Sequence, residues 1–166
     1  LSGIASKKMQ AKIAKDAGAV GGDLVINLHA VQKRDRDAIF KEFKSVVDIL
    51  EDVKVIAQIP YLWRYDRLAI PWIIDIAAEA GVYCIKDWTT RENFLMPDGE
   101  KLDYTEETRI QYLKYIKNYI QENNLPLIIK IAGRVTKDNA RLFVKEGASL
   151  IGLSYRKTKS LREALK

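Results

Sequence analysis

The chain has 166 residues, 48% of them hydrophobic and 30% charged, which is enough to bury a core and too apolar for a disordered segment. The net charge is +6, but acidic residues follow the basic ones and no aromatic–basic motif of an RNA-binding module is present, which argues against nucleic-acid binding. No apolar stretch approaches the roughly 20 residues that span a membrane.

Apolar patterns with helical and strand periodicity alternate along the chain. They predict a helix over residues 5–17, a strand over 23–28, a helix over 36–50, a strand over 53–59, a helix from 66 or 67 to 80 and a strand over 82–86. Residues 88–103 form a predicted polar loop with a turn at 97–99, and they precede a helix over 105–122, a strand over 126–132, a helix over 136–146, a strand over 149–153 and a short basic helix from 158. Thr105 is expected to begin its helix, Gly81 is expected to end one, and Pro71 can delay the start of that same helix.

Five strands, each followed by a helix, indicate parallel βαβ units. Two α/β architectures are compatible with this order, an open doubly wound sheet and a (β/α)8 barrel of the TIM type. No Gly-x-Gly-x-x-Gly follows any strand, and the polar residues inside the strands favour the barrel. A barrel rarely has fewer than about 200 residues. We therefore predict that residues 1–166 form a single barrel domain with about five βα units, incomplete at its N-terminus.

Two lysines in matching positions are the most informative feature. Lys86 ends the apolar run 82–86, and Lys130 lies in the run 127–132. Two charges about 5 Å apart on neighbouring strands repel by roughly 3 kcal/mol at an effective dielectric of 20, and burial also favours the neutral amine. A neutral amine can attack a carbonyl group. The alternative, in which each ammonium reaches solvent at its strand end, is open at this point.

Two further charged residues share the predicted interior. The period of two along a strand places Asp23 and Lys54 on faces that can point to the same side as the two lysines. Four charged groups inside a barrel are difficult to explain as packing, because functional groups normally lie near its C-terminal mouth.

Several segments together resemble the deoxyribose-phosphate aldolase family. They are residues 18–27, 53–56, 80–86, 130–133 and 146–154, which include Gly-Gly-Asp-Leu-Val-Ile-Asn, Val-Lys-Val-Ile, Val-Tyr-Cys-Ile-Lys and Lys-Ile-Ala-Gly. The similarity runs in order across nearly the whole chain. It places the first residues after the third strand of that family, so the chain is expected to be a divergent member without its N-terminal part.

The resemblance implies a class I aldolase that uses a lysine Schiff base and neither metal nor cofactor. In that family the reaction converts 2-deoxy-D-ribose 5-phosphate to glyceraldehyde 3-phosphate and acetaldehyde. Lys86 matches the lysine that forms the imine, Lys130 the second lysine, and Asp23 the aspartate of the proton relay, while Lys54 matches a lysine near the site. A carboxylate beside two amines suits the proton transfers of imine chemistry. A buried structural ion pair is the alternative for Asp23.

Phosphate recognition departs from the family pattern. The family follows its imine lysine with Thr-Ser-Thr-Gly, where this chain has Asp87-Trp88-Thr89-Thr90-Arg91. Bulky residues restrict the close backbone approach that glycines allow, but arginines can hold an anion through bidentate contacts. The predicted phosphate-binding residues are Thr90, Arg91, Gly133, Arg134, Gly152, Ser154 and Arg156. Each arginine can equally be a solvated surface charge.

We expect a phosphorylated or otherwise anionic aldehyde or sugar as the partner, no membrane association, and a homo-oligomer. The single cysteine, Cys84, excludes an internal disulfide and makes the reducing cytoplasm the expected location. Two alternatives remain open. One is a divergent imine-forming aldolase or lyase with another anionic aldehyde, and the other is a catalytically silent barrel that binds an anion or a partner.

Overall fold

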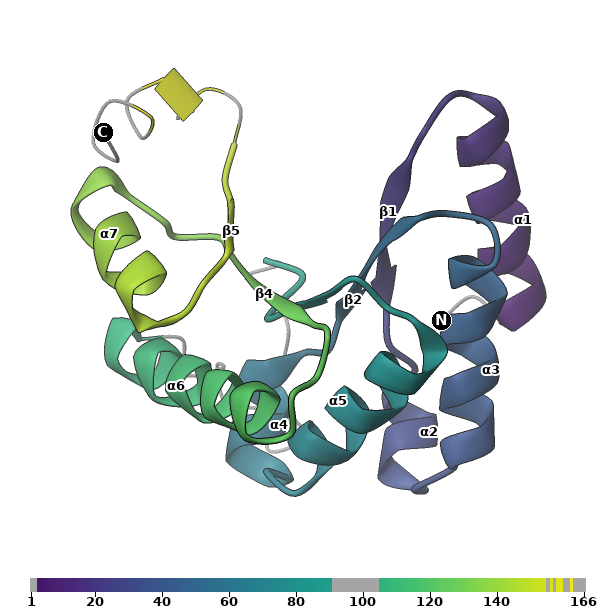
Figure 1. The fold of residues 1–166 in the computed structure, drawn as a ribbon, viewed down its shortest axis with the longest axis horizontal. Helices are drawn as coiled ribbons and strands as arrows, with labels where there is room; N and C mark the ends of the chain where they lie inside the picture. Colours follow the sequence, from purple (N-terminus) through teal and green to yellow (C-terminus); the bar gives the residue numbers. More distant parts are fainter. Residues whose placement is uncertain (1–2, 91–104, 155, 157, 160–161, 163–166) are drawn as a thin grey trace.

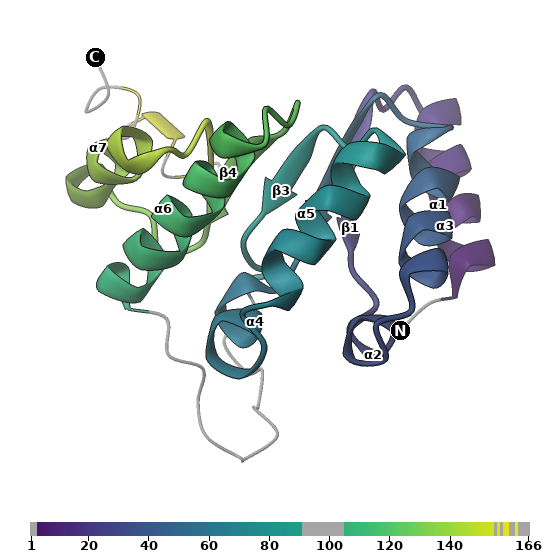
Figure 2. The same ribbon diagram turned by 60° about the horizontal axis from the view of Figure 1, so that its bottom comes forward.

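The computed structural model describes residues 3–90, 105–154, 156, 158, 159 and 162. One or two helices connect each strand to the next along this part of the chain (Figures 1 and 2). The helices are α1 (Ile4–Asp16), α2 (Leu28–Gln32), α3 (Arg36–Val47), α4 (Ile59–Tyr65), α5 (Ala69–Ala80), α6 (Glu106–Glu122) and α7 (Lys137–Glu146). The strands are β1 (Gly21–Val25), β2 (Asp52–Ile56), β3 (Cys84–Lys86), β4 (Ile128–Ala132) and β5 (Leu150–Gly152).

The five strands form one parallel sheet in the order β1-β2-β3-β4-β5. In Figure 1 the strands follow an arc, with α1, α3, α5, α6 and α7 outside it. Right-handed crossovers that always advance in one direction place every connecting helix on the same face of the sheet. A doubly wound sheet would reverse its strand order and carry helices on both faces. The predicted fold class, five βα units of TIM-barrel type, is therefore confirmed.

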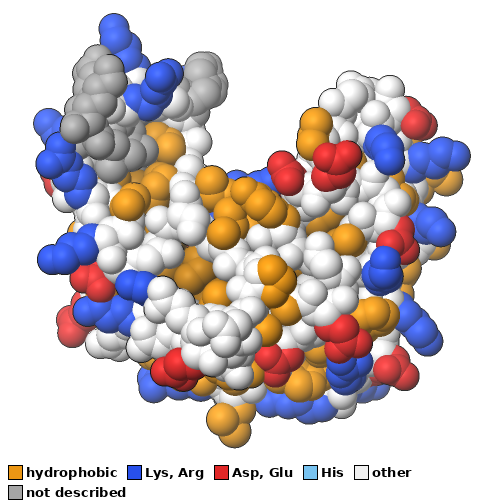
Figure 3. Space-filling view, in the orientation of Figure 1, with side chains coloured by type: hydrophobic (Ala, Val, Ile, Leu, Met, Phe, Trp, Pro, Cys, Tyr) orange, Lys and Arg blue, Asp and Glu red, His pale blue; other side chains and the backbone are white. Residues whose placement is uncertain are grey.

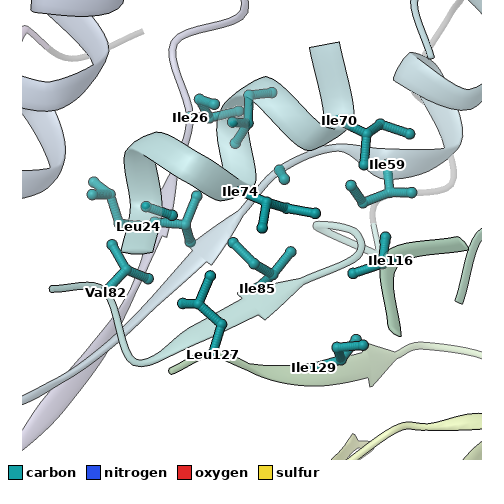
Figure 4. Packing of buried hydrophobic residues seen from close by; sticks show 14 of the residues in the cluster. Leu24, Ile26, Ile59, Ile70, Ile74, Val82, Ile85, Ile116, Leu127 and Ile129 are labelled. Atoms are coloured by element: carbon teal, nitrogen blue, oxygen red, sulfur yellow. The ribbon is translucent and has the colours of Figure 1, made fainter. Parts of the chain in front are cut away.

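The hydrophobic core lies between the convex face of the sheet and the helices (Figure 4). Alternate strand residues point into it, so Val53 and Val55 are fully buried while Lys54 between them is only half-buried. The same alternation buries Ile129 and Ile131 on either side of Lys130. Each fully buried aliphatic side chain contributes roughly 1.5–3 kcal/mol. The core therefore determines which strand residues face the other side.

Strands β1 and β2 are shorter than predicted because polar residues end them and begin two unpredicted helices. The predicted strand 23–28 ends at Val25, since the Asn27 side chain accepts hydrogen bonds from the amides of His29 and Ala30 and caps α2. The predicted strand 53–59 ends at Ile56, and Gln58 adopts a left-handed conformation with φ 54° at the start of α4. Asn27 thus ends β1 by a side-chain cap, whereas Gln58 ends β2 by its backbone conformation, since its side chain makes no capping hydrogen bond.

The predicted boundaries of the longer helices differ from the structure by at most three residues, the largest differences being at the end of α3, which stops at Val47 and not at residue 50, and at the start of α5. Thr105 caps α6 by accepting a hydrogen bond from the Thr108 amide, and Gly81 ends α5 with φ 82°. Helix α5 begins at Ala69, two residues before Pro71, so its start is later than 66 or 67. The predicted turn at 97–99 lies outside the described residues, as does most of the predicted helix from 158.

Across the described ranges, none of the helices has the length and apolar character needed to cross a membrane.

Candidate active site

Lys86 and Lys130, here called the lysine pair, occupy neighbouring positions on the concave face of the sheet. They are direct register partners in the parallel pairing of β3 and β4. Parallel strands lie about 4.8 Å apart, so the two side chains leave the backbone next to each other. Their side chains are 11% and 19% exposed. The expectation that the two lysines are neighbours on one face is therefore met.

The Asp23 carboxylate lies between the two ammonium groups. Its Oδ2 accepts a hydrogen bond from Lys86 Nζ at 2.7 Å, and its Oδ1 lies 3.7 Å from Lys130 Nζ. Burial raises the pKa of Asp23, but the hydrogen bond and charge of Lys86 and the charges of Lys130 and Lys54 outweigh it, so the pKa lies below its usual 3.8. The carboxylate thus carries a negative charge that offsets the repulsion between the two lysines.

Lys54 shares this face but its ammonium group points away from the lysine pair. Lys54 is the register partner of Asp23 and of Cys84. Its Nζ donates to the carbonyl of Asp52 at 3.1 Å and lies 5.7 Å from the ring centre of Tyr83, toward the beginning of β2. Its charge still acts on Asp23, where it is the weakest of the interactions that lower the pKa. The structure places Lys54 at the margin of the candidate site.

The lysine pair and Asp23 lie on the face of the sheet that carries no helices. In Figure 3 the molecule is hollowed between the two ends of the arc, where hydrophobic side chains are visible. Gly152 in β5 borders the lysine pair: a Cβ atom at this position would lie 2.8 Å from the Cβ of Ala132 and 3.1 Å from Lys130 Cε. Glycine at this position therefore leaves room for the Lys130 side chain.

The predicted phosphate-binding residues follow the carboxyl ends of β3, β4 and β5. The Gly133 amide donates to the Gly152 carbonyl at 3.2 Å, which brings these two together. Three residues at these ends have a left-handed backbone, with φ 65° at Thr90, 72° at Gly133 and 47° at Arg134. Glycine adopts this conformation without strain, whereas at Thr90 and Arg134 it is strained, and strained backbone often occurs at binding sites.

The other predicted phosphate-binding residues are less informative. Arg134, Ser154 and Arg156 are exposed, which suits either an anion site or a solvated surface. Arg91 lies outside the described residues.

Sequence reasoning missed a buried polar cluster behind the lysine pair, formed by Asp87, Arg109 and Tyr112. All three side chains are buried, and both Arg109 and Tyr112 bind Asp87 Oδ2. A signal was present in the sequence. Arg109 falls on the apolar stripe of α6 that also contains Leu113 and Ile116, and a charge in such a stripe indicates a buried partner.

Cys84 lies between the backbone positions of Lys54 and Ile128 and is fully buried. Burial raises the pKa of its thiol to about 12, although the nearby lysine charges oppose the rise. The thiol is therefore protonated at neutral pH, which agrees with a packing role. Among the residues that the structure describes, no three His, Cys, Asp or Glu side chains form a group that could hold a metal ion.

Comparison with known proteins finds relatives among aldolases. No protein-family model matches the chain. Two curated deoxyribose-phosphate aldolases are similar: the Acholeplasma laidlawii protein is 27% identical over 151 residues, and the Clostridioides difficile protein is 28% identical over 153 residues. These alignments cover 89% and 90% of this chain but 60% and 62% of the relatives. The chain thus spans about three fifths of the length of these relatives.

Solved structures show the same fold. An aldolase named QR15 superposes with a TM-score of 0.77 and 23% identity, covering 99% of this chain and 69% of QR15. Deoxyribose phosphate aldolase from Aeropyrum pernix superposes with a TM-score of 0.73 and 22% identity, covering 99% of this chain and 64% of that one. The chain is a distant relative of deoxyribose-phosphate aldolases and matches part of their barrel.

Replacing Gly152 with alanine tests the packing beside the lysine pair. We expect Gly152→Ala to lower the free energy of unfolding by about 1–3 kcal/mol, because its Cβ would overlap Ala132 and press on Lys130. Urea unfolding measures the change. Gly3→Ala is the matched control, since nothing lies within 4 Å of a Cβ there. Equal stability of Gly152→Ala and the unsubstituted protein would contradict the packing.

Replacing Asp23 with asparagine tests the charge balance. At pH 7 we expect Asp23→Asn to be less stable than the unsubstituted protein, because the two lysine charges then face each other without a carboxylate. A lowered pKa stabilises the fold above the unfolded pKa, and this contribution is lost as the pH falls through the folded pKa. The difference between the two proteins should therefore shrink below about pH 4.

Thermal unfolding between pH 7 and pH 2 measures the difference in stability between Asp23→Asn and the unsubstituted protein. Asp48→Asn is the control, because Asp48 forms an exposed ion pair with Lys44 within one helix and should matter little at any pH. A constant difference between Asp23→Asn and the unsubstituted protein from pH 7 to pH 2 would refute the assigned charge balance.

Proposed function

We propose that this chain, a distant relative of the deoxyribose-phosphate aldolases, makes or breaks a carbon–carbon bond through an imine on Lys86. The observation that carries the proposal is the position of Lys86 opposite Lys130, with the Asp23 carboxylate in contact with both. Two amines and one carboxylate supply a nucleophile, a neighbouring charge and a proton carrier within a few ångströms. The similarity to curated aldolases supports this assignment.

Imine formation requires Lys86 to lose its proton and attack the carbonyl carbon of an aldehyde. Asp23 Oδ2 accepts a hydrogen bond from Lys86 Nζ, so the carboxylate is the group that can take up this proton. Asp23 then holds the proton that the next step needs. The carbinolamine that results takes up a proton at its hydroxyl group and loses water, which leaves the imine.

Bond cleavage follows from the imine. Its positive nitrogen accepts the electron pair of the bond between the α and β carbons, while the β-hydroxyl group loses its proton and becomes the carbonyl group of the released aldehyde. The enamine that remains gains a proton at the α carbon and is hydrolysed to the second aldehyde. Asp23 and Lys130 are the groups that we assign to these proton transfers, because both lie beside Lys86.

The proposed substrate is an anionic aldehyde or sugar, with 2-deoxy-D-ribose 5-phosphate as the first compound to test. Its phosphate would lie at the carboxyl ends of β4 and β5, where Gly133 and Gly152 meet and Arg134 follows. Along the described strands, the three lysines on this face outnumber the carboxylates of Asp23 and Asp52 that share it, which favours an anion. The expected homo-oligomer and cytoplasmic location remain predictions.

Reductive trapping tests the proposal directly. With acetaldehyde or 2-deoxy-D-ribose 5-phosphate and borohydride, we expect a covalent adduct that peptide mass mapping assigns to Lys86. Lys86→Ala should abolish this adduct. Lys130→Met should slow trapping at pH 7, because it removes the neighbouring amine that we assign to proton transfer at Lys86.

The matched control is Lys44→Met, which removes an exposed lysine that pairs with Asp48 on α3. We expect it to trap at the unsubstituted rate. Adducts spread evenly over surface lysines, with no preference for Lys86, would refute the imine assignment and favour the silent barrel.

A further inference from the structure

The buried polar cluster lies directly behind the lysine pair. Asp87 follows Lys86 in the chain, so its side chain points to the opposite, helix-covered side of the sheet. Its Oδ1 accepts a hydrogen bond from the Ala132 amide at 2.9 Å, and its Oδ2 accepts one from the Tyr112 hydroxyl at 2.8 Å. The Asp87 carboxylate thus joins the end of β3 to the end of β4 and to α6.

Arg109 holds the same strand ends from α6. Its Nη1 donates to the Gly133 carbonyl at 2.8 Å, and its Nη2 donates to the Ala132 carbonyl at 3.1 Å and approaches Asp87 Oδ2 at 3.3 Å. The guanidinium group lies over the Phe143 ring, 4.7 Å from its centre. One side chain therefore fixes two consecutive carbonyl groups just beyond Lys130.

Backbone hydrogen bonds extend this connection to the lysine pair itself. The Asp87 amide donates to the Lys130 carbonyl at 3.1 Å, and the Ala57 amide donates to the Lys86 carbonyl at 3.0 Å. The regular pairing of β3 with β4 ends at Lys86 and Lys130. The buried polar cluster thus continues the connection between the two strands at the level where the site lies.

Stability alone does not account for these charges. Burial raises the pKa of Asp87, and Arg109, Tyr112 and the Ala132 amide offset only part of that rise. Burying two charges costs several kcal/mol per ion, and apolar side chains of similar size are often as good for stability. In some proteins buried polar groups specify register, and a slip of β3 or β4 by one residue would send the lysine of that strand to the helix side of the sheet.

We propose that Asp87, Arg109 and Tyr112 are positioning residues that hold Lys86 and Lys130 at the same height above the sheet, with both amines facing Asp23. The inference rests on the proposed function, because the position of the two amines matters only if they take part in imine chemistry. The three residues touch no reacting atom. They act through the backbone of β3 and β4, from the face opposite the site.

A pair of tyrosines on α6 supplies a matched test. Tyr112→Phe removes one hydroxyl group that donates to Asp87, and Tyr119→Phe removes one that donates to Asp75 at the same distance of 2.8 Å. We expect Tyr112→Phe to slow acetaldehyde trapping at Lys86 about threefold and to change the pH profile of trapping. We expect Tyr119→Phe to leave the trapping rate and its pH profile unchanged. Equal trapping rates and pH profiles in these two variants would overturn the inference.

A double variant tests the cluster more strongly. Asp87→Asn with Arg109→Gln removes both charges together, so neither is left buried and unpaired. We expect trapping at Lys86 to fall about tenfold or more, since a misplacement near 1 Å can cost up to about 100-fold. Urea unfolding establishes whether the variant folds. A folded double variant that traps at the unsubstituted rate would overturn the inference, and if the variant does not fold, Tyr112→Phe decides.

A second readout separates this inference from the proposed function. Reductive methylation with formaldehyde and borohydride labels lysines without any enzymatic reaction, and mass mapping gives the ratio of labelling at Lys86 to Lys130, with exposed Lys44 as the reference. If acetaldehyde gives no adduct at Lys86 in the unsubstituted protein, the proposed function fails. The methylation ratio then decides the inference: a ratio changed about threefold in Tyr112→Phe supports it, and an unchanged ratio overturns it.

Discussion

The register between β3 and β4 is the constraint on which the candidate site depends. It places Lys86 beside Lys130 and directs both side chains to the face without helices. Because side chains alternate along a strand, the apolar neighbours Ile85, Ile129 and Ile131 must point to the core when the lysines point away from it. Core packing and site geometry are thus two results of one alignment, and neither can change without the other.

A single carboxylate determines the electrostatics of that face. Asp23 comes from β1, which is not a neighbour of β3, yet it reaches both members of the lysine pair. The curvature of the sheet makes this contact possible, because residues from strands that are not adjacent approach each other across the inside of an arc. The site is therefore a property of the curved sheet rather than of any one βα unit.

Much of the fold could be predicted from the sequence, since a long periodic pattern of apolar residues indicates which side chains of a helix or strand face the core. The strand runs that contain Lys86 and Lys130 are identifiable because a lysine in a short apolar run is unusual. Helices α2 and α4 were not predicted, because each is too short to show helical periodicity. Each follows a polar residue, Asn27 or Gln58, that resembles the end of the preceding strand.

The site was predictable in part, for a physical reason. Strand period indicates the face on which a residue lies, but not where a long side chain ends. Lys54 was correctly assigned to the face of Asp23, yet its four-carbon chain turns back toward Asp52. In the sequence Asp87 is notable only as a departure from the family pattern, and its partners on α6 cannot be assigned without knowing how that helix packs.

The lone thiol beneath the lysines offers a way to observe motion in this part of the sheet. Cys84 is the only cysteine in the chain, is wholly buried, and sits in the same three-residue strand as Lys86. Its side chain shares the helix-free face with Lys86, so a thiol-specific reagent reaches it only when the side chains that cover it move aside. The rate of thiol labelling therefore measures how often the cover over this part of the concave face opens.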